Sequence, residues 1–169
     1  MKIFTSSTGS AKLALLKELT VVEQTKEFTL GNDKVRYTRG NQSFQLTLNG
    51  ATESFNIFYN YYEGWDQSGQ KSGAYIFRPK TDTSKIYSTI SKAYYADGQT
   101  TAIFVLQGDK AVTRVYFNRE TDYVRNFGFL VETHLSSISV SDNVGKEVTF
   151  NLKTTLNNNR SFYTDSMGL

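Results

Sequence analysis

The chain has no cysteine and only one proline, Pro79, among its 169 residues. Without cysteine, disulfide bridges cannot hold the fold together. With a single proline, a proline-rich linker or disordered tail is excluded. Length and composition therefore predict one ordered domain with a core of its own.

Long apolar runs are also missing, since no stretch approaches the ~20 residues that span a bilayer. Near the start, four leucines are separated by charged residues, as in Leu13-Ala-Leu-Leu-Lys-Glu-Leu19. This pattern lacks the continuous apolar region of a secretory signal, so we expect no signal peptide and no membrane span within this segment.

Charge of one sign is not concentrated anywhere. The net charge is +3 and the isoelectric point is about 9.0, but lysines and arginines are scattered along the chain. A nucleic-acid surface needs a basic stripe or patch, and none is present. We therefore expect no nucleic-acid partner.

Aromatic residues are abundant, with 11 Tyr and 12 Phe, and together with Val, Ile and Thr they favour strands. The expected strands are separated by turn residues such as Gly31-Asn-Asp33 and Asp97-Gly98. They cover residues 26–30, 34–39, 43–48, 54–59, 74–78, 86–95, 101–107, 111–118, 127–140, 147–153 and 161–163. Short strands at this spacing predict an all-β fold, an antiparallel β-sandwich.

Two of the turns predict tight hairpins. Leu48-Asn-Gly-Ala51 and Gln107-Gly-Asp-Lys110 both have central residues that tolerate a positive φ. Before the first strand, residues 1–19 form a loosely ordered start. There, Leu15, Leu16 and Leu19 would share one face of a short helix over 11–19. The sandwich then extends over 20–169.

Several motifs occur in an order that resembles a known family. Tyr59-Asn60 is followed by a polar loop and Ser72-Gly-Ala-Tyr-Ile-Phe-Arg-Pro79. Later come Val140-Ser-Asp-Asn-Val-Gly-Lys-Glu-Val148 and Arg160-Ser-Phe-Tyr-Thr-Asp-Ser166. This series resembles the C-terminal, β-rich region of family 38 glycoside hydrolases, the zinc-dependent α-mannosidases, and most closely the lysosomal kind.

The resemblance implies a galactose mutarotase-like sandwich that belongs to a longer enzyme. That enzyme is a retaining exo-α-mannosidase, which trims mannose from glycans in the lysosome or secretory pathway. Its zinc ligands and catalytic carboxylates lie in an N-terminal catalytic domain, which this segment lacks. A zinc site of the family type needs two histidines, and this chain has only His134. We therefore assign no catalytic residue, cofactor or metal ligand here, and expect mannose-containing glycans and the catalytic domain as partners.

Five residues are candidates for substrate contact: Tyr59, Tyr62, Trp65, Arg78 and Asp165. Aromatic rings stack on sugars, and the family places a tyrosine at the position of Tyr59 beside the mannose. Three of these candidates also have a structural alternative. Tyr59 would end a core face formed with Phe55 and Ile57, Arg78 would make an ion pair, and Asp165 would order its turn.

Two other functions remain open at this point. The chain could be a stand-alone carbohydrate-binding sandwich that uses Trp65 and neighbouring tyrosines as a stacking platform. It could also be a structural β-domain whose aromatic residues all lie in the core, because fold alone does not specify function.

Overall fold

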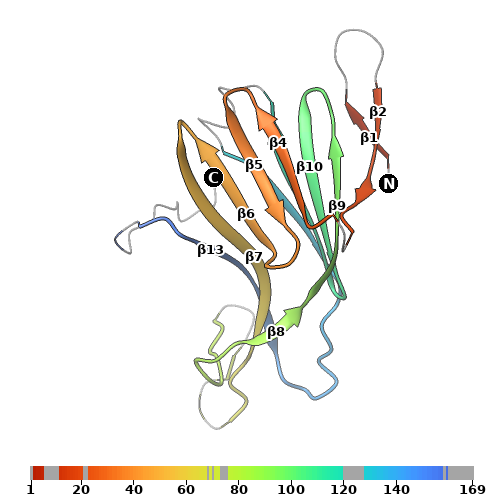
Figure 1. The fold of residues 1–169 in the computed structure, drawn as a ribbon. Coiled ribbons are helices and arrows are strands. Elements are labelled where there is room, and N and C mark those ends of the chain that lie inside the picture. Colours follow the sequence, from red (N-terminus) through yellow and green to blue (C-terminus); the bar gives the residue numbers. More distant parts are fainter. Residues whose placement is uncertain are drawn as a thin grey trace.

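The protein is all-β. The computed structural model describes residues 2–5, 12–20, 23–67, 69, 71–72, 76–119, 128–157 and 159. In these residues every paired strand is antiparallel, no segment is helical, and there is thus no helix that could cross a membrane. Figure 1 shows the two larger sheets facing each other, which confirms the predicted sandwich.

One layer is a six-stranded sheet in the order β13-β7-β6-β5-β4, with β8 paired to β7. Four successive strands linked by hairpins, β4 to β7, form a meander, and β13, the last of the described strands, is added beside β7 (Figure 1). The strands are β4 (Thr25–Leu30), β5 (Asp33–Thr38), β6 (Ser43–Leu48), β7 (Ala51–Glu63), β8 (Lys85–Ser88) and β13 (Lys146–Thr154).

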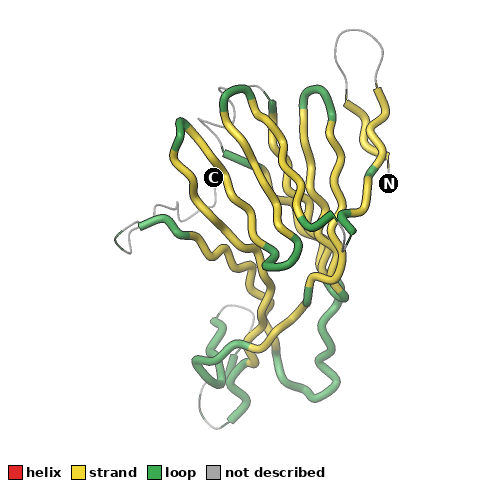
Figure 2. Tube along the Cα trace, in the orientation of Figure 1, coloured by secondary structure: helices red, strands yellow, loops and turns green. Residues whose placement is uncertain are grey.

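The other layer is a five-stranded sheet in the order β12-β11-β10-β9-β3. Its strands are β3 (Lys17–Glu18), β9 (Ile90–Asp97), β10 (Thr101–Gly108), β11 (Ala111–Asn118) and β12 (Leu130–Leu135). A separate two-stranded hairpin is formed by β1 (Lys2–Thr5) and β2 (Lys12–Leu15). Figure 2 shows that strand dominates the described chain.

Aromatic side chains fill the space between the two sheets. Phe28 and Phe44 of the six-stranded sheet contact Phe104 of the facing sheet, with ring centroids 4.9 and 5.4 Å apart. Tyr37 and Phe117 are also fully buried. Along β5 and β11, buried residues alternate with more exposed ones, as expected when one face of each sheet packs on the other.

The first predicted hairpin is confirmed, and the second differs in detail. Asn49 and Gly50 both have positive φ, 50° and 82°, where Leu48 pairs with Ala51. Gly108 is not in the left-handed region. A Cβ there would lie 2.4 Å from the Ser88 hydroxyl oxygen and 2.9 Å from the Thr89 carbonyl. At Gly108, glycine is therefore needed for close approach rather than for turn conformation.

The predicted helix over 11–19 is wrong. Residues 12–15 and 17–18 are strands, and Lys17 pairs with Tyr95. Leu16 packs on the outer face of the five-stranded sheet, whereas Leu19 is buried between the sheets. A helix of two turns is only marginally stable without tertiary contacts. Here the tertiary contact is backbone pairing with β9, which only an extended chain can make.

Three other strand predictions need correction. The run 86–95 is two strands in different sheets, because the chain passes from β8 to β9 at Thr89. The run 127–140 contains a strand only over Leu130–Leu135 among its described residues, and Ile76–Arg78 is not a strand. The predicted strand 161–163 and residues 74–75 lie outside the described residues.

Candidate functional site

The described residues of the motif segments 72–79 and 140–148 meet at one end of the six-stranded sheet, beside the end of β7, whereas the motif 160–166 lies outside the described residues. We define the tip as the described residues of 61–67, 69, 71–72, 76–85 and 142–146. It comprises the end of β7, the following loop, the start of β8 and the turn before β13, and it extends below the sandwich in Figure 1.

Backbone hydrogen bonds join these segments. The Gly64 amide donates to the Gly145 carbonyl at 2.7 Å. The Trp65 amide donates to the Arg78 carbonyl, and the Lys80 amide donates to the Glu63 carbonyl, both at 2.7 Å. The loop after β7 therefore folds back on the strand that it leaves, and the turn before β13 closes the other side.

The hydroxyl of Ser72 fastens this loop. It donates to the Arg78 carbonyl at 2.6 Å and accepts from the Arg78 amide at 2.8 Å and the Trp65 amide at 3.2 Å. A Cβ on Gly64 would lie 2.9 Å from the Cβ of Ser72, so only glycine fits there. The sequence alone did not identify Gly64 as the neighbour of Ser72.

Ion pairs between lysines and carboxylates surround the tip. Lys85 pairs with Glu63, and Lys80 pairs with Asp66. Hydrogen bonds from Gln67 and from Lys80 lower the pKa of Asp66. In the turn, Lys146 lies 2.7 Å from Asp142 and lowers its pKa, and hydrogen bonding to Glu63 raises the pKa of Lys85.

Two of these carboxylates, Asp66 and Asp142, are stabilised in the ionised form by their hydrogen bonds and by nearby lysines. A retaining glycosidase needs a carboxyl group whose pKa is raised, so that it can act as an acid. The described carboxyl groups whose pKa departs from the ordinary value are all lowered, by hydrogen bonds and by nearby cations. At the tip, the two carboxylates with lowered pKa, Asp66 and Asp142, both form ion pairs with lysines.

Tyr59 lies in the core. Its side chain is 1% exposed, and its hydroxyl lies 2.6 Å from the Thr113 hydroxyl and 2.5 Å from the Thr133 hydroxyl, both on the facing sheet. Its ring packs edge-on against Phe150. Of the two interpretations that the sequence left open, this geometry favours the core residue over the sugar contact.

Three other candidates lie together in the tip. Tyr62 is half-buried opposite Glu147, Trp65 is 36% exposed, and the side chain of Arg78 is exposed. The backbone of Arg78 is fixed by Ser72 on both its amide and its carbonyl. Asp165 lies outside the described residues, and His134 is exposed on β12, away from this loop in sequence.

A small cavity of about 210 Å³ adjoins the tip, where the register of β7 and β8 shifts between Tyr59 and Asn60. Asn60 donates to the Ser84 hydroxyl at 2.8 Å. Phe58 and Ile86 also line this cavity and are 38% and 72% exposed. Neither was predicted as a site residue from the sequence, although Phe58 is an apolar residue at a position where its strand otherwise carries polar side chains, as at Ser54, Asn56 and Asn60.

The described residues do not fit a zinc site. No group of three or more His, Cys, Asp or Glu side chains lies within reach of one ion anywhere in the described ranges. Zinc in proteins is held by such clusters. The described part of this segment therefore offers no set of ligands through which zinc could take part in a reaction.

Comparison with known proteins relates the chain to α-mannosidases, although no protein-family model matches it. It is 32% identical over 129 residues to a lysosomal alpha-mannosidase of Dictyostelium discoideum, covering 71% of this chain. A probable alpha-mannosidase of Arabidopsis thaliana is 30% identical over 131 residues, and another from that plant is 29% identical over 160 residues. The matches span only 12%, 12% and 14% of these relatives.

Proposed function

We propose that the chain is a non-catalytic β-sandwich segment of a larger family 38 α-mannosidase, and that its tip frames the mannose pocket. The parent enzyme would be zinc-dependent and retaining, and would release terminal mannose from glycans in the lysosome or secretory pathway. The observation that carries this proposal is the similarity to a short stretch of three α-mannosidases, each far longer than the match.

The arrangement of the tip supports the framing role. Trp65 offers a partly exposed aromatic face on a loop that Ser72 and Arg78 hold in place. Aromatic faces stack on sugar rings, and fixed loops position such contacts with little loss of conformational entropy. Tyr62 and Arg78 would add polar contacts, as would Asp165 by resemblance, while Tyr59 would support the tip from the core.

The first test is an activity assay on the 169-residue chain. The purified chain should not hydrolyse an aryl α-mannoside, with or without added zinc, because Glu63, Asp66 and Asp142 of the tip form ion pairs and the described residues offer no cluster of zinc ligands. Zinc-dependent turnover by the pure chain would overturn the proposal.

The framing role requires the full-length protein. There, Trp65→Ala should raise KM for mannosides about two- to tenfold with a smaller change in kcat, because a stacking contact binds substrate without taking part in bond cleavage. Trp65→Phe keeps an aromatic face and should restore most of the affinity. Unchanged KM in both variants would show that the tip lies away from the substrate.

The exposure of Trp65 favours one alternative, a stand-alone carbohydrate-binding module. In that case the 169-residue chain alone would bind mannose-containing glycans, and Trp65→Ala would abolish binding. A glycan titration of the chain without any saturable signal would remove this alternative.

A further inference from the structure

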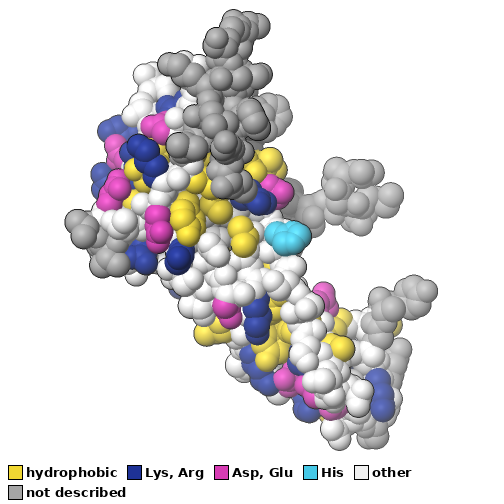
Figure 3. Space-filling view, turned by 90° about the vertical axis from the view of Figure 1, so that its right-hand side faces the viewer, with side chains coloured by type: hydrophobic (Ala, Val, Ile, Leu, Met, Phe, Trp, Pro, Cys, Tyr) yellow, Lys and Arg dark blue, Asp and Glu magenta, His cyan; other side chains and the backbone are white. Residues whose placement is uncertain are grey.

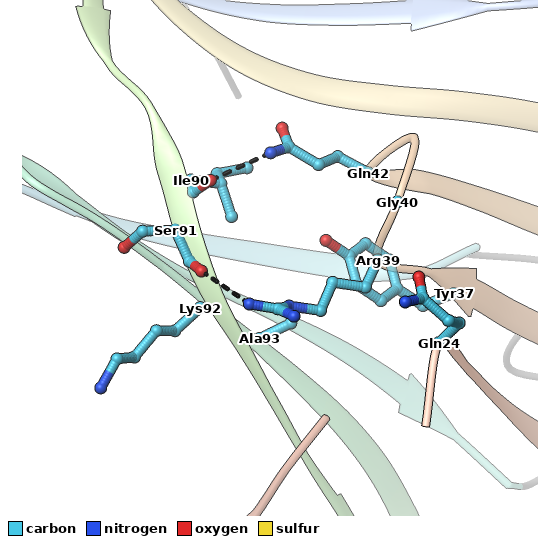
Figure 4. A pocket seen from close by; sticks show the side chains of 9 residues that line it. All are labelled: Gln24, Tyr37, Arg39, Gly40, Gln42, Ile90, Ser91, Lys92 and Ala93. Atoms are coloured by element: carbon cyan, nitrogen blue, oxygen red, sulfur yellow. Dashed lines mark hydrogen bonds between the residues drawn. The ribbon is translucent and has the colours of Figure 1, made fainter. Parts of the chain in front are cut away.

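A second cavity, of about 290 Å³, lies between the two sheets at a different place from the tip (Figure 4). Its wall comes from the segment before β4, from the end of β5 with the turn that follows, and from the start of β9. The lining residues are Gln24, Tyr37, Arg39, Gly40, Gln42, Ile90, Ser91, Lys92 and Ala93.

The hydroxyl of Tyr37 has no hydrogen-bond partner among the described residues, although the residue is 0% exposed. Figure 4 shows it directed into the space between Gln42 and the Arg39 side chain. Burial raises the pKa of Tyr37 to about 12, so the hydroxyl keeps its proton at neutral pH and is available as a donor. A buried polar group without a partner is uncommon and points to a missing one.

The cavity is also positively charged. Arg39 and Lys92 are the charged residues of its lining, which has no carboxylate among the described residues, and Figure 4 shows the Lys92 ammonium directed away from Arg39 and Tyr37. The Arg39 guanidinium, which has five N–H donors, donates to the Ser91 carbonyl at 3.3 Å. Gln42 donates to the Ile90 carbonyl at 3.0 Å, and Figure 4 shows its amide oxygen directed away from Arg39 and Tyr37.

We infer that this cavity binds a small oxyanion, a carboxylate, phosphate or sulfate group on a ligand no larger than about one sugar ring. The Arg39 guanidinium supplies the charge, and the Tyr37 hydroxyl supplies a buried donor. The volume lies at the lower end of the range for small-molecule sites, roughly 300 Å³. A bound ligand would reach Tyr37 by displacing the Arg39 side chain, which is held by a long hydrogen bond.

The inference is independent of the proposed mannosidase role, because it involves different residues and an anionic ligand. It predicts that ligand binding also stabilises the fold, since Arg39 and Gln42 already connect the turn after β5 to β9. A ligand that binds only the folded state raises the unfolding temperature with concentration.

The test is a titration of the isotope-labelled 169-residue chain, followed by NMR, with three separate probes: inorganic phosphate, glucuronate and neutral mannose. We expect saturable shifts for residues 37–42 and 90–93 with at least one anion and none with mannose. Tighter binding of glucuronate would identify an acidic sugar as the ligand class, and tighter binding of phosphate would identify a phosphoryl group.

Matched variants distinguish this site from general charge attraction. Arg39→Gln and Tyr37→Phe should each weaken binding about tenfold. Arg36→Gln removes the same charge from β5 at a residue that pairs with Glu27, and should leave binding unchanged. Tyr37→Phe keeps the ring that packs on Phe44 and Phe104, so it should fold. No saturable anion binding, or equal binding in all variants, would overturn the inference.

Discussion

The hydroxyl oxygen of Tyr59 lies 2.6 Å from the hydroxyl oxygen of Thr113, across the space between the two sheets. Thr133, beside Thr113 on the next strand, makes a second contact of 2.5 Å. A long aromatic side chain from one layer is thus hydrogen-bonded to two threonines of the other. The contact fixes how the sheets sit on each other near the base of the tip.

Removing this hydroxyl should destabilise the fold. Tyr59→Phe leaves the buried Thr113 hydroxyl with one partner fewer, and we expect a loss of about 1–3 kcal/mol in the free energy of unfolding. Urea denaturation measures it. The double variant Tyr59→Phe/Thr113→Val should recover part of the loss, because it removes both polar groups. The control is Tyr62→Phe, because Tyr62 lies on the opposite face of β7 from Tyr59 and is only half-buried, so the free energy of unfolding should change little. Equal losses in Tyr59→Phe and Tyr62→Phe would show that the bonds of the Tyr59 hydroxyl do not stabilise the fold.

Gly64 should not tolerate a side chain. Gly64→Ala places a Cβ 2.9 Å from the Cβ of Ser72, so we expect a loss of about 1–3 kcal/mol and opening of the tip. Hydrogen exchange of the Trp65 and Lys80 amides reports on this directly. Gly145→Ala is a matched control, since a Cβ there meets nothing within 4 Å. Equal exchange in the two variants would show that the contact with Ser72 does not restrain the loop.

Acid should weaken the segment at Thr89, where the chain passes from β8 in one sheet to β9 in the other. Asp109 accepts hydrogen bonds from the Thr89 amide at 2.9 Å and the Ser88 hydroxyl at 3.0 Å, and these bonds lower its pKa. Because its folded pKa lies below its unfolded value, its contribution is fully present above about pH 4 and is lost as the pH falls through the folded pKa.

Unfolding midpoints measured from about pH 6 to about pH 2 test this prediction. Asp109→Asn should flatten the fall in stability at the acid end, whereas Asp82→Asn, at an exposed position in the loop, should not. Identical pH profiles for the parent chain and Asp109→Asn would show that the hydrogen bonds of Asp109 to Ser88 and Thr89 are not the cause.

The free edge of β13 should promote self-association of the 169-residue chain. Phe150 and Leu152 are 49% and 47% exposed on this edge strand, whose only partner among the described strands is β7. Exposed apolar edges pair with other chains. Leu152→Lys should shift the chain toward monomer in sedimentation experiments, and Val140→Lys, an exposed residue outside any strand, should not. A parent chain that stays monomeric at high concentration would count against this prediction.

Part of the candidate site could be predicted from the sequence. The motif segments around Ser72, Arg78 and Gly145 were identified from their order along the chain, and the structure brings these three residues together. Their partners could not be predicted, because the contact of Ser72 with Gly64 depends on where the loop folds back. The cavity around Tyr37 was missed for the same reason, since its walls come from segments about fifty residues apart.

The sequence by itself determined what depends on neighbouring residues. Alternation and β-branched or aromatic residues specified strands, and Asn49-Gly50 specified a two-residue turn, because φ preference and side-chain direction are local properties. Only the tertiary structure decided that Thr89 separates two sheets, that Leu16 and Leu19 lie on opposite faces, and that Tyr59 is buried. These outcomes depend on which distant strands pair and which faces exclude water, and no short stretch of sequence contains that information.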